Sequence, residues 1–141
     1  MKTITLFRPV GEKELQLIAE SGFKEFPPRL KWQPIFYPVL NEVYASEIAS
    51  KWNTKDEFGN YLGFVTQFDI TEEEFEKYEI ENVGGKIHDE LWVPSDRLSE
   101  FNKAIQGEIS VLKVYIGSKY IKSEAIEVTE LIATIEKIYE N

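Results

Sequence analysis

The sequence predicts one α+β domain in which mixed or antiparallel sheets are flanked by short helices. The chain has 141 residues, a length that fits one domain. Hydrophobic residues make up 43% of it, so it can bury a core and is not a disordered chain. Short strand-like and helical segments alternate along it, without repeats or low-complexity tracts. This order of elements favours the α+β class.

The first forty residues predict a strand, a helix and a long loop. Residues 3–8 (TITLFR) are rich in β-forming side chains and precede a proline, which indicates a strand. Residues 11–22 carry apolar residues at helical spacing and end in glycine, which indicates a short helix. Residues 23–40 hold four of the six prolines and five aromatic residues. We expect a loop with inward-packed aromatics around one short strand at residues 35–37, because proline donates no backbone hydrogen bond.

A helix is expected to follow this loop directly. Asn41 is a good N-cap for a helix over residues 42–52. Within that helix Tyr44, Ile48 and Trp52 recur every four residues. Side chains four apart share one helical face, so we expect these three in the core.

The rest of the chain predicts further short strands and helices. Residues 61–70 (YLGFVTQFDI) alternate apolar and polar side chains, which indicates a half-buried strand. Thr71 and Glu74 match a capping box for a short helix over residues 72–78. A strand pair is expected around the Gly84-Gly85 turn. A further helix, capped by Ser95, is predicted to carry Leu98, Phe101 and Ile105 on one face. A strand is predicted over residues 108–117. A final helix, capped by Thr129, is predicted to carry Leu131, Ile132, Ile135, Ile138 and Tyr139.

Composition excludes several classes of function. The net charge of −9 repels phosphate backbones, which argues against general nucleic-acid binding. The absence of cysteine excludes disulfides, thiol catalysis and cysteine-ligated zinc, and it suits a reducing compartment. No signal peptide and no apolar stretch of about 20 residues is present, so we expect a cytoplasmic protein without a membrane span. A single histidine cannot build a multi-histidine metal site, and the common catalytic motifs are missing, so no metal is expected.

The segment GGKIHDELWVP, residues 84–94, contains that one histidine and the most chemically suggestive pattern. Because side chains alternate along a strand, His88, Glu90 and Trp92 are predicted to share one face. Alternate residues lie about 6.6–6.8 Å apart, so one ligand could contact all three. The simpler interpretation, which composition alone favours, is a partly exposed strand face with solvated polar groups.

Arg8 and the aromatic loop also allow two interpretations. Arg8 ends the first strand, where it either closes the core or clamps a phosphate or ribose with its rigid fork of donors. Phe36 and Tyr37 either pack in the core or form a platform for a flat ring.

The order of four segments resembles the ADP-ribosyltransferase fold family. These segments are LFRPVGEKELQLIAESGF, PIFYPVLNEVYASEIA, YLGFVTQFDI and HDELWVP, and they cover roughly residues 6–116. A narrower resemblance links RPVG, FPPRL…WQPIFYPVLN and ELWVP to small bacterial proteins often labelled ADP-ribosylation/J-crystallin proteins. The chain resembles the transferases and not the larger, all-helical, magnesium-binding ADP-ribosylglycohydrolases.

The resemblance implies an NAD-dependent mono-ADP-ribosyltransferase, or an NAD glycohydrolase, that needs no metal. Glu90 matches the catalytic glutamate, which would stabilise positive charge on the ribose as the nicotinamide leaves. His88 stands where such enzymes position the acceptor, whose identity the sequence does not reveal, a protein being one candidate. The residues implied are Glu90 and His88 for catalysis, and Arg8, Phe36, Tyr37 and Trp92 for binding NAD.

Two other classes of function remain open. One is a module on the same fold that binds a nucleotide or a protein without turnover. The other is an acidic interaction or immunity-type protein that covers a basic partner. Arg8 and Glu90 facing one pocket would favour the enzyme, and Arg8 buried elsewhere would favour the module. A large exposed acidic or aromatic patch away from Glu90 would favour the interaction protein.

Overall fold

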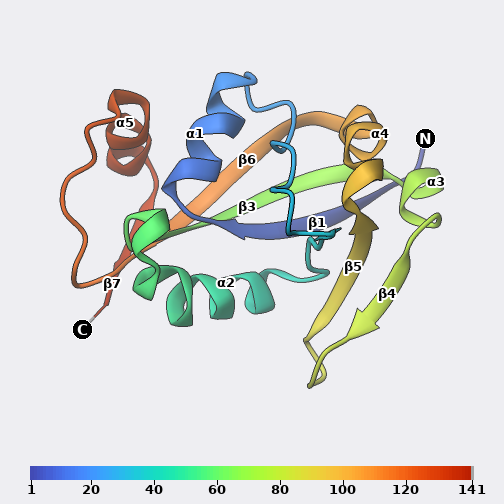
Figure 1. Ribbon diagram of the computed structural model, residues 1–141, viewed down its shortest axis with the longest axis horizontal. Helices are drawn as coiled ribbons and strands as arrows, with labels where there is room; N and C mark the ends of the chain where they lie inside the picture. Colours follow the sequence, from blue (N-terminus) through green and yellow to red (C-terminus); the bar gives the residue numbers. More distant parts are fainter. Residues whose placement is uncertain (141) are drawn as a thin grey trace.

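The chain forms a four-stranded and a three-stranded sheet with short helices around them (Figure 1). This computed structural model describes residues 1–140. The strands are β1 Thr3–Val10, β2 Ile35–Phe36, β3 Leu62–Thr71, β4 Glu79–Asn82, β5 Asp89–Pro94, β6 Ile105–Ile116 and β7 Glu136–Tyr139. The helices are α1 Glu12–Glu20, α2 Glu42–Lys51, α3 Glu72–Phe75, α4 Leu98–Lys103 and α5 Ile126–Thr134, with 3₁₀ turns η1 Asn53–Lys55, η2 Glu57–Gly59 and η3 Ser95–Arg97. The predicted α+β class is confirmed.

The larger sheet has the order β1-β3-β6-β7 and the smaller sheet the order β2-β5-β4. All pairs are antiparallel except β6 and β7, which are parallel, so the arrangement is mixed as predicted. Val39 connects the two sheets by bridging to Phe7 in β1 and to Glu90 in β5. Beyond Phe7 the outer edge of β1 is open, and Pro9 is the next residue whose backbone nitrogen faces that edge. Proline suits this position because it has no N–H to leave unpaired.

Two hydrophobic clusters cover the opposite faces of the larger sheet. The main cluster includes Leu6 of β1 and Leu15 of α1, together with phenylalanines that pack edge to face. The second cluster lies under α2 and includes Ala45, Ala49 and Val65. Figure 1 accordingly shows α1 and α2 on opposite sides of β1. The first half of β3 is therefore buried on both faces and not on one alone, since it is a central strand covered from both sides.

Local capping signals were correct at two of four helix starts. Asn41 caps α2, its side chain accepting from the Tyr44 N–H at 2.7 Å, and Thr71 caps α3 in the same way at 3.2 Å. Ser95 does not cap a helix, because it lies within η3 and makes no capping hydrogen bond. Thr129 is likewise inside α5, where its hydroxyl donates to the Ala125 carbonyl one turn earlier at 3.1 Å.

The predicted final helix is wrong in its second half. The helix α5 ends at Thr134, and Ile135 is extended. Ile138 and Tyr139 belong to β7, which pairs in parallel with β6. The open backbone groups along the edge of β6 provide a partner there, and this competes with continuing the helix. Ile105 also leaves its predicted helix, since it begins β6.

Candidate functional site

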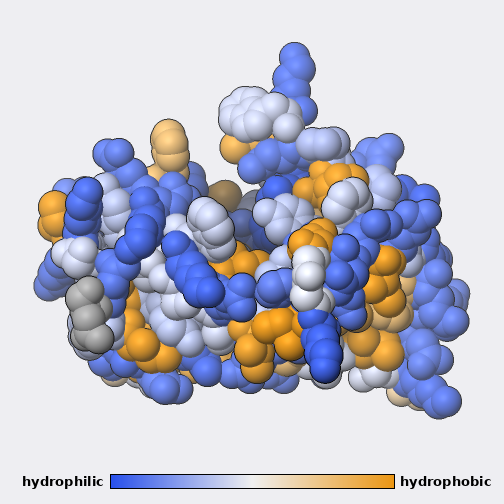
Figure 2. All heavy atoms as spheres, turned by 90° about the horizontal axis from the view of Figure 1, so that it is seen from below, coloured by the Kyte–Doolittle hydropathy of each residue, from blue (hydrophilic) through white to orange (hydrophobic). Residues whose placement is uncertain are grey.

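A cleft of about 810 Å³ crosses the open edge of β1. The helix α1 forms one wall, and the C-terminal part of α2 with η1 and η2 forms the other. The loop over residues 27–33 borders the cleft. Figure 2 shows a face of the molecule that is hollowed between raised parts, with hydrophobic residues exposed among hydrophilic ones. The volume lies in the range typical of small-molecule sites, about 300–1,000 Å³.

Four large aromatic side chains line this cleft and remain exposed. Their exposed fractions are 75% for Trp32, 40% for Tyr37, 70% for Trp52 and 95% for Phe58. Trp32 and Tyr37 do not pack inward as expected for their loop, although Phe36 does, being fully buried. Trp52 is not in the core either, since it caps the C-terminal end of α2 and its side chain lines the cleft. Exposed aromatic groups gathered around a hollow are typical of a binding surface.

Arg8 lies at the base of this cleft with its charge already compensated. It is 6% exposed and forms a bidentate ion pair with Glu14, at 2.7 Å from Nε and 3.0 Å from Nη2. Its guanidinium carbon is 4.7 Å from the centroid of the Phe36 ring and 5.7 Å from that of Tyr37. Burial acts to lower the pKa of Arg8, but the charge and hydrogen bonds of Glu14 outweigh this and raise it.

Arg29, from the loop at the rim of the cleft, was missed by the sequence analysis. It is half-buried, and its Nε donates to the Ile35 carbonyl at 3.2 Å. Burial, followed by the positive charge of Arg8, lowers the pKa of Arg29. The segment FPPRL contains no pattern that distinguishes this arginine from a solvated surface residue.

A second cluster of polar groups surrounds Glu90. The Tyr44 hydroxyl donates to Oε2 of Glu90 at 2.5 Å, and Nε1 of Trp92 donates to Oε1 at 3.0 Å. Glu90 is 7% exposed. Burial and the hydrogen bond to Glu90 raise the pKa of Tyr44 well above its ordinary value. The His88 ring lies 4.7 Å from that of Tyr44, and its Nε2 is 3.2 Å from Oε1 of Glu47.

The structure thus brings the candidate residues into two groups. Arg8 contacts Phe36 and Tyr37 beside the cleft. Glu90 and Trp92 share one face of β5, as the alternation predicted, with Leu91 and Val93 buried on the other. The ring of His88 packs on that of Tyr44, which in turn donates its hydroxyl to Glu90.

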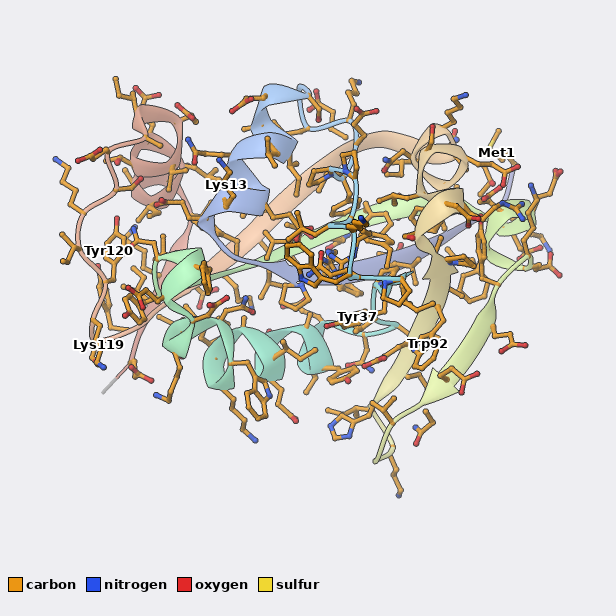
Figure 3. All side chains as sticks on the ribbon, in the orientation of Figure 1. Met1, Lys13, Tyr37, Trp92, Lys119 and Tyr120 are labelled. Atoms are coloured by element: carbon orange, nitrogen blue, oxygen red, sulfur yellow. The ribbon has the colours of Figure 1, made fainter. Side chains whose placement is uncertain are left out.

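The cleft and the Glu90 cluster are neighbours but separate. Glu90, His88 and Trp92 do not line the cleft. Tyr37 lies on the cleft side, where the guanidinium carbon of Arg8 is 5.7 Å from the centroid of its ring. Figure 3 shows Tyr37 near the centre of the molecule, between Lys13 of α1 and Trp92 of β5 in this view.

Comparisons leave the family open. No family model, no curated protein and no solved structure matches this chain. Within residues 1–140, no helix is long and apolar enough to cross a membrane. The same residues contain no group of three or more metal-ligating side chains.

Proposed function

We propose that this protein binds a nucleotide-type ligand in the aromatic cleft at the open edge of β1, with NAD as the first candidate. The observation that carries the proposal is the combination of exposed aromatic rings with basic side chains around one hollow. The aromatic residues are Trp32, Tyr37, Trp52 and Phe58, and the basic ones are Lys13 and Arg29, with Arg8 beside them already paired to Glu14.

Each half of such a ligand has a counterpart in the cleft. A flat base or nicotinamide ring gains free energy by stacking on an aromatic face, about 1–3 kcal/mol per base. A phosphate is attracted by cationic groups, and in the cleft these outnumber the carboxylates, Glu14 and Asp56. Concave shape and a local cation favour a small anionic ligand over a broad protein surface.

The resemblance to the ADP-ribosyltransferase fold family supports the same ligand. It assigns Arg8 to the phosphate or ribose of NAD and Phe36 or Tyr37 to the nicotinamide, and the guanidinium carbon of Arg8 lies 5.7 Å from the centroid of the Tyr37 ring. We propose, as part of the same hypothesis, that the fold is ADP-ribosyltransferase-like. Because Glu90 does not line the cleft, a module that binds the ligand without turnover is better supported than an enzyme.

Cleavage of NAD at Glu90 is the second candidate. It is favoured by the position of the Glu90 cluster, since Tyr44 lies one helical turn, about 6 Å, from Ile48, which lines the cleft. For an extended dinucleotide to bring its nicotinamide ribose to the buried Glu90 carboxylate, Tyr44 or Trp92 would have to release the oxygen that each one holds. The glycosidic bond would then break, nicotinamide leaving with the bonding electron pair while a water oxygen bonds to the ribose carbon and loses a proton. His88 would orient an acceptor that replaces this water.

Binding is tested by calorimetry and tryptophan fluorescence with NAD and adenosine. Two of the three tryptophans line the cleft, so ligand should quench emission, and Trp92→Phe should keep this quenching. Tyr37→Ala and Trp52→Ala should each weaken binding roughly 5- to 100-fold. Tyr139→Ala, which removes an exposed ring away from the cleft, is the matched control. A folded protein that binds neither compound at millimolar concentration would refute the proposal and favour the acidic interaction protein.

Catalysis is tested by nicotinamide release from NAD. If the second candidate is correct, Glu90→Gln should lower turnover by about 10²–10³ with binding retained. Asp96→Asn, on an exposed carboxylate after the same strand, should change nothing. Binding without release in the wild-type protein would identify the module.

A further inference from the structure

The three arginines of the chain differ in how their charge is balanced. Arg8 is paired with Glu14 and Arg97 with Glu100. Arg29 has no carboxylate within 4 Å among residues 1–140. It is therefore the arginine whose charge is left available at the cleft.

The position of Arg29 is set by its loop. The two preceding prolines, Pro27 and Pro28, have restricted backbone torsions. After it, the Gln33 N–H donates to the Leu30 carbonyl at 2.8 Å, and the Leu30 N–H donates to the Gln33 side chain at 3.0 Å. The Nε of Arg29 is held by the Ile35 carbonyl, and its two terminal nitrogens make no hydrogen bond to the described residues. A side chain anchored in this way loses less entropy when it binds a ligand.

The electrostatic surroundings of Arg29 favour an anion beside it. Burial and then the neighbouring Arg8 lower the pKa of Arg29, and the charge of Glu14 offsets this only in part. Both oxygens of Glu14, the nearby carboxylate, already accept from Nε and Nη2 of Arg8. A bound phosphate would supply the missing negative charge and accept from the free terminal nitrogens.

We infer that Arg29 is the phosphate-binding residue of the cleft, and that Arg8 is a structural residue held by Glu14. The inference rests on the proposed function, in which the ligand is a nucleotide, and names the residue that contacts its anionic part. Lys13 also lines the cleft, but its exposed, flexible side chain offers a point charge without the planar fork of an arginine.

The test measures how much the phosphates of a ligand add to its affinity. Adenosine, AMP, ADP and inorganic pyrophosphate are titrated by calorimetry into the wild-type protein, Arg29→Ala, Arg29→Lys and Lys119→Ala. In the wild type, affinity should rise from adenosine to ADP. Arg29→Ala should weaken ADP and pyrophosphate binding roughly 10- to 100-fold, the loss expected for charge-assisted hydrogen bonds, and leave adenosine unchanged.

The two remaining variants separate specific contact from general charge. Arg29→Lys should recover only part of the affinity, because a single ammonium replaces a two-pronged contact. Lys119→Ala removes an equal charge from an exposed residue that does not line the cleft, and it should behave like the wild type. Arg29 is on an exposed loop, so its variants are expected to stay folded, and circular dichroism checks this.

Failure of the inference and failure of the proposed function give different results. If the affinity for ADP exceeds the affinity for adenosine by the same factor in Arg29→Ala as in the wild type, the inference is overturned. The proposed nucleotide site is then still supported. If adenosine and NAD do not bind but pyrophosphate binds through Arg29, the inference holds and the proposed nucleotide function fails. If nothing binds to the folded wild-type protein, both are overturned.

Discussion

Arg8 in β1 and Glu90 in β5 lie in strands of two sheets that Val39 bridges, yet their side chains project to opposite sides. Arg8 lies on the face of α1, where it pairs with Glu14. Glu90 lies on the face of α2, where it accepts from Tyr44. A ligand that rests against Arg8 therefore lies away from the carboxylate of Glu90, which is buried and does not line the cleft. This relationship is the main structural argument for binding over catalysis.

The ion pair between Arg8 and Glu14 should contribute strongly to stability. Glu14→Ala leaves the guanidinium of Arg8 buried and without a counter-charge. Breaking a fully buried pair costs about 3–5 kcal/mol, and because Glu14 is partly exposed we expect about 2–3 kcal/mol. Urea denaturation measures this free energy of unfolding. Glu20→Ala, an exposed glutamate on the same helix, is the control and should change it little.

The hydrogen bond from Tyr44 to Glu90 should also be visible in the free energy of unfolding. Tyr44→Phe keeps the ring that packs on His88 but removes one of two donors to a buried carboxylate. We expect a loss of about 1–3 kcal/mol. Tyr139→Phe removes a hydroxyl from an exposed ring and serves as the control. Equal stability of the two variants would show that the hydrogen bond from Tyr44 to Glu90 does not contribute to the free energy of unfolding.

Gly117 should tolerate no side chain. A Cβ there would lie 2.2 Å from the Thr54 carbonyl oxygen and 3.0 Å from that of Tyr61, so backbone would have to move. Gly117→Ala should cost about 2–3 kcal/mol by overpacking. Gly107→Ala is the comparison, since a Cβ there meets nothing within 4 Å. Its positive φ of 75° alone should cost about 1 kcal/mol. A smaller loss at Gly117 than at Gly107 would contradict the close approach of η1 to the end of β6.

Sequence patterns predicted the parts of the structure that depend on neighbouring residues. Asn41 caps α2 because its side chain reaches an N–H three residues later, a contact that exists wherever a helix starts there. Glu90 and Trp92 share a face because strand side chains alternate. Within a single strand or helix turn, the spacing of residues in the sequence determines which side chains are neighbours.

The predictions that failed depended on distant segments. Ile138 and Tyr139 continue the helical spacing of α5, but β6 supplies an open edge that the sequence pattern does not reveal. Trp52 continues the apolar stripe of α2, yet the helix ends one residue earlier. Arg8 pairs with Glu14 only six residues along the chain, whereas Arg29 reaches the same cleft because its loop returns to the edge of β1, and this return is not visible in the sequence pattern.

Stability should fall in alkaline solution because two tyrosines are held protonated by the fold. Burial, and then hydrogen bonds to carboxylates, raise the pKa values of Tyr44 and Tyr78 above their ordinary value of 10.0. The carboxylates are Glu90 and Glu74, both buried. Above pH 10 the unfolded chain releases these protons while the folded protein retains them, so unfolding becomes more favourable as pH rises.

The stabilisation from each tyrosine is thus complete below about pH 10 and is lost as pH rises toward the folded-state pKa. Urea denaturation of the wild-type protein at intervals from pH 8 to pH 11 should show a falling free energy of unfolding. The double variant Tyr44→Phe, Tyr78→Phe has no such groups, so its stability should fall less steeply over the same range, although it starts lower. The control is Tyr139→Phe, whose slope should match the wild type because that ring is exposed. Parallel slopes for the double variant and the wild type would mean that other groups, such as lysines, cause the alkaline loss.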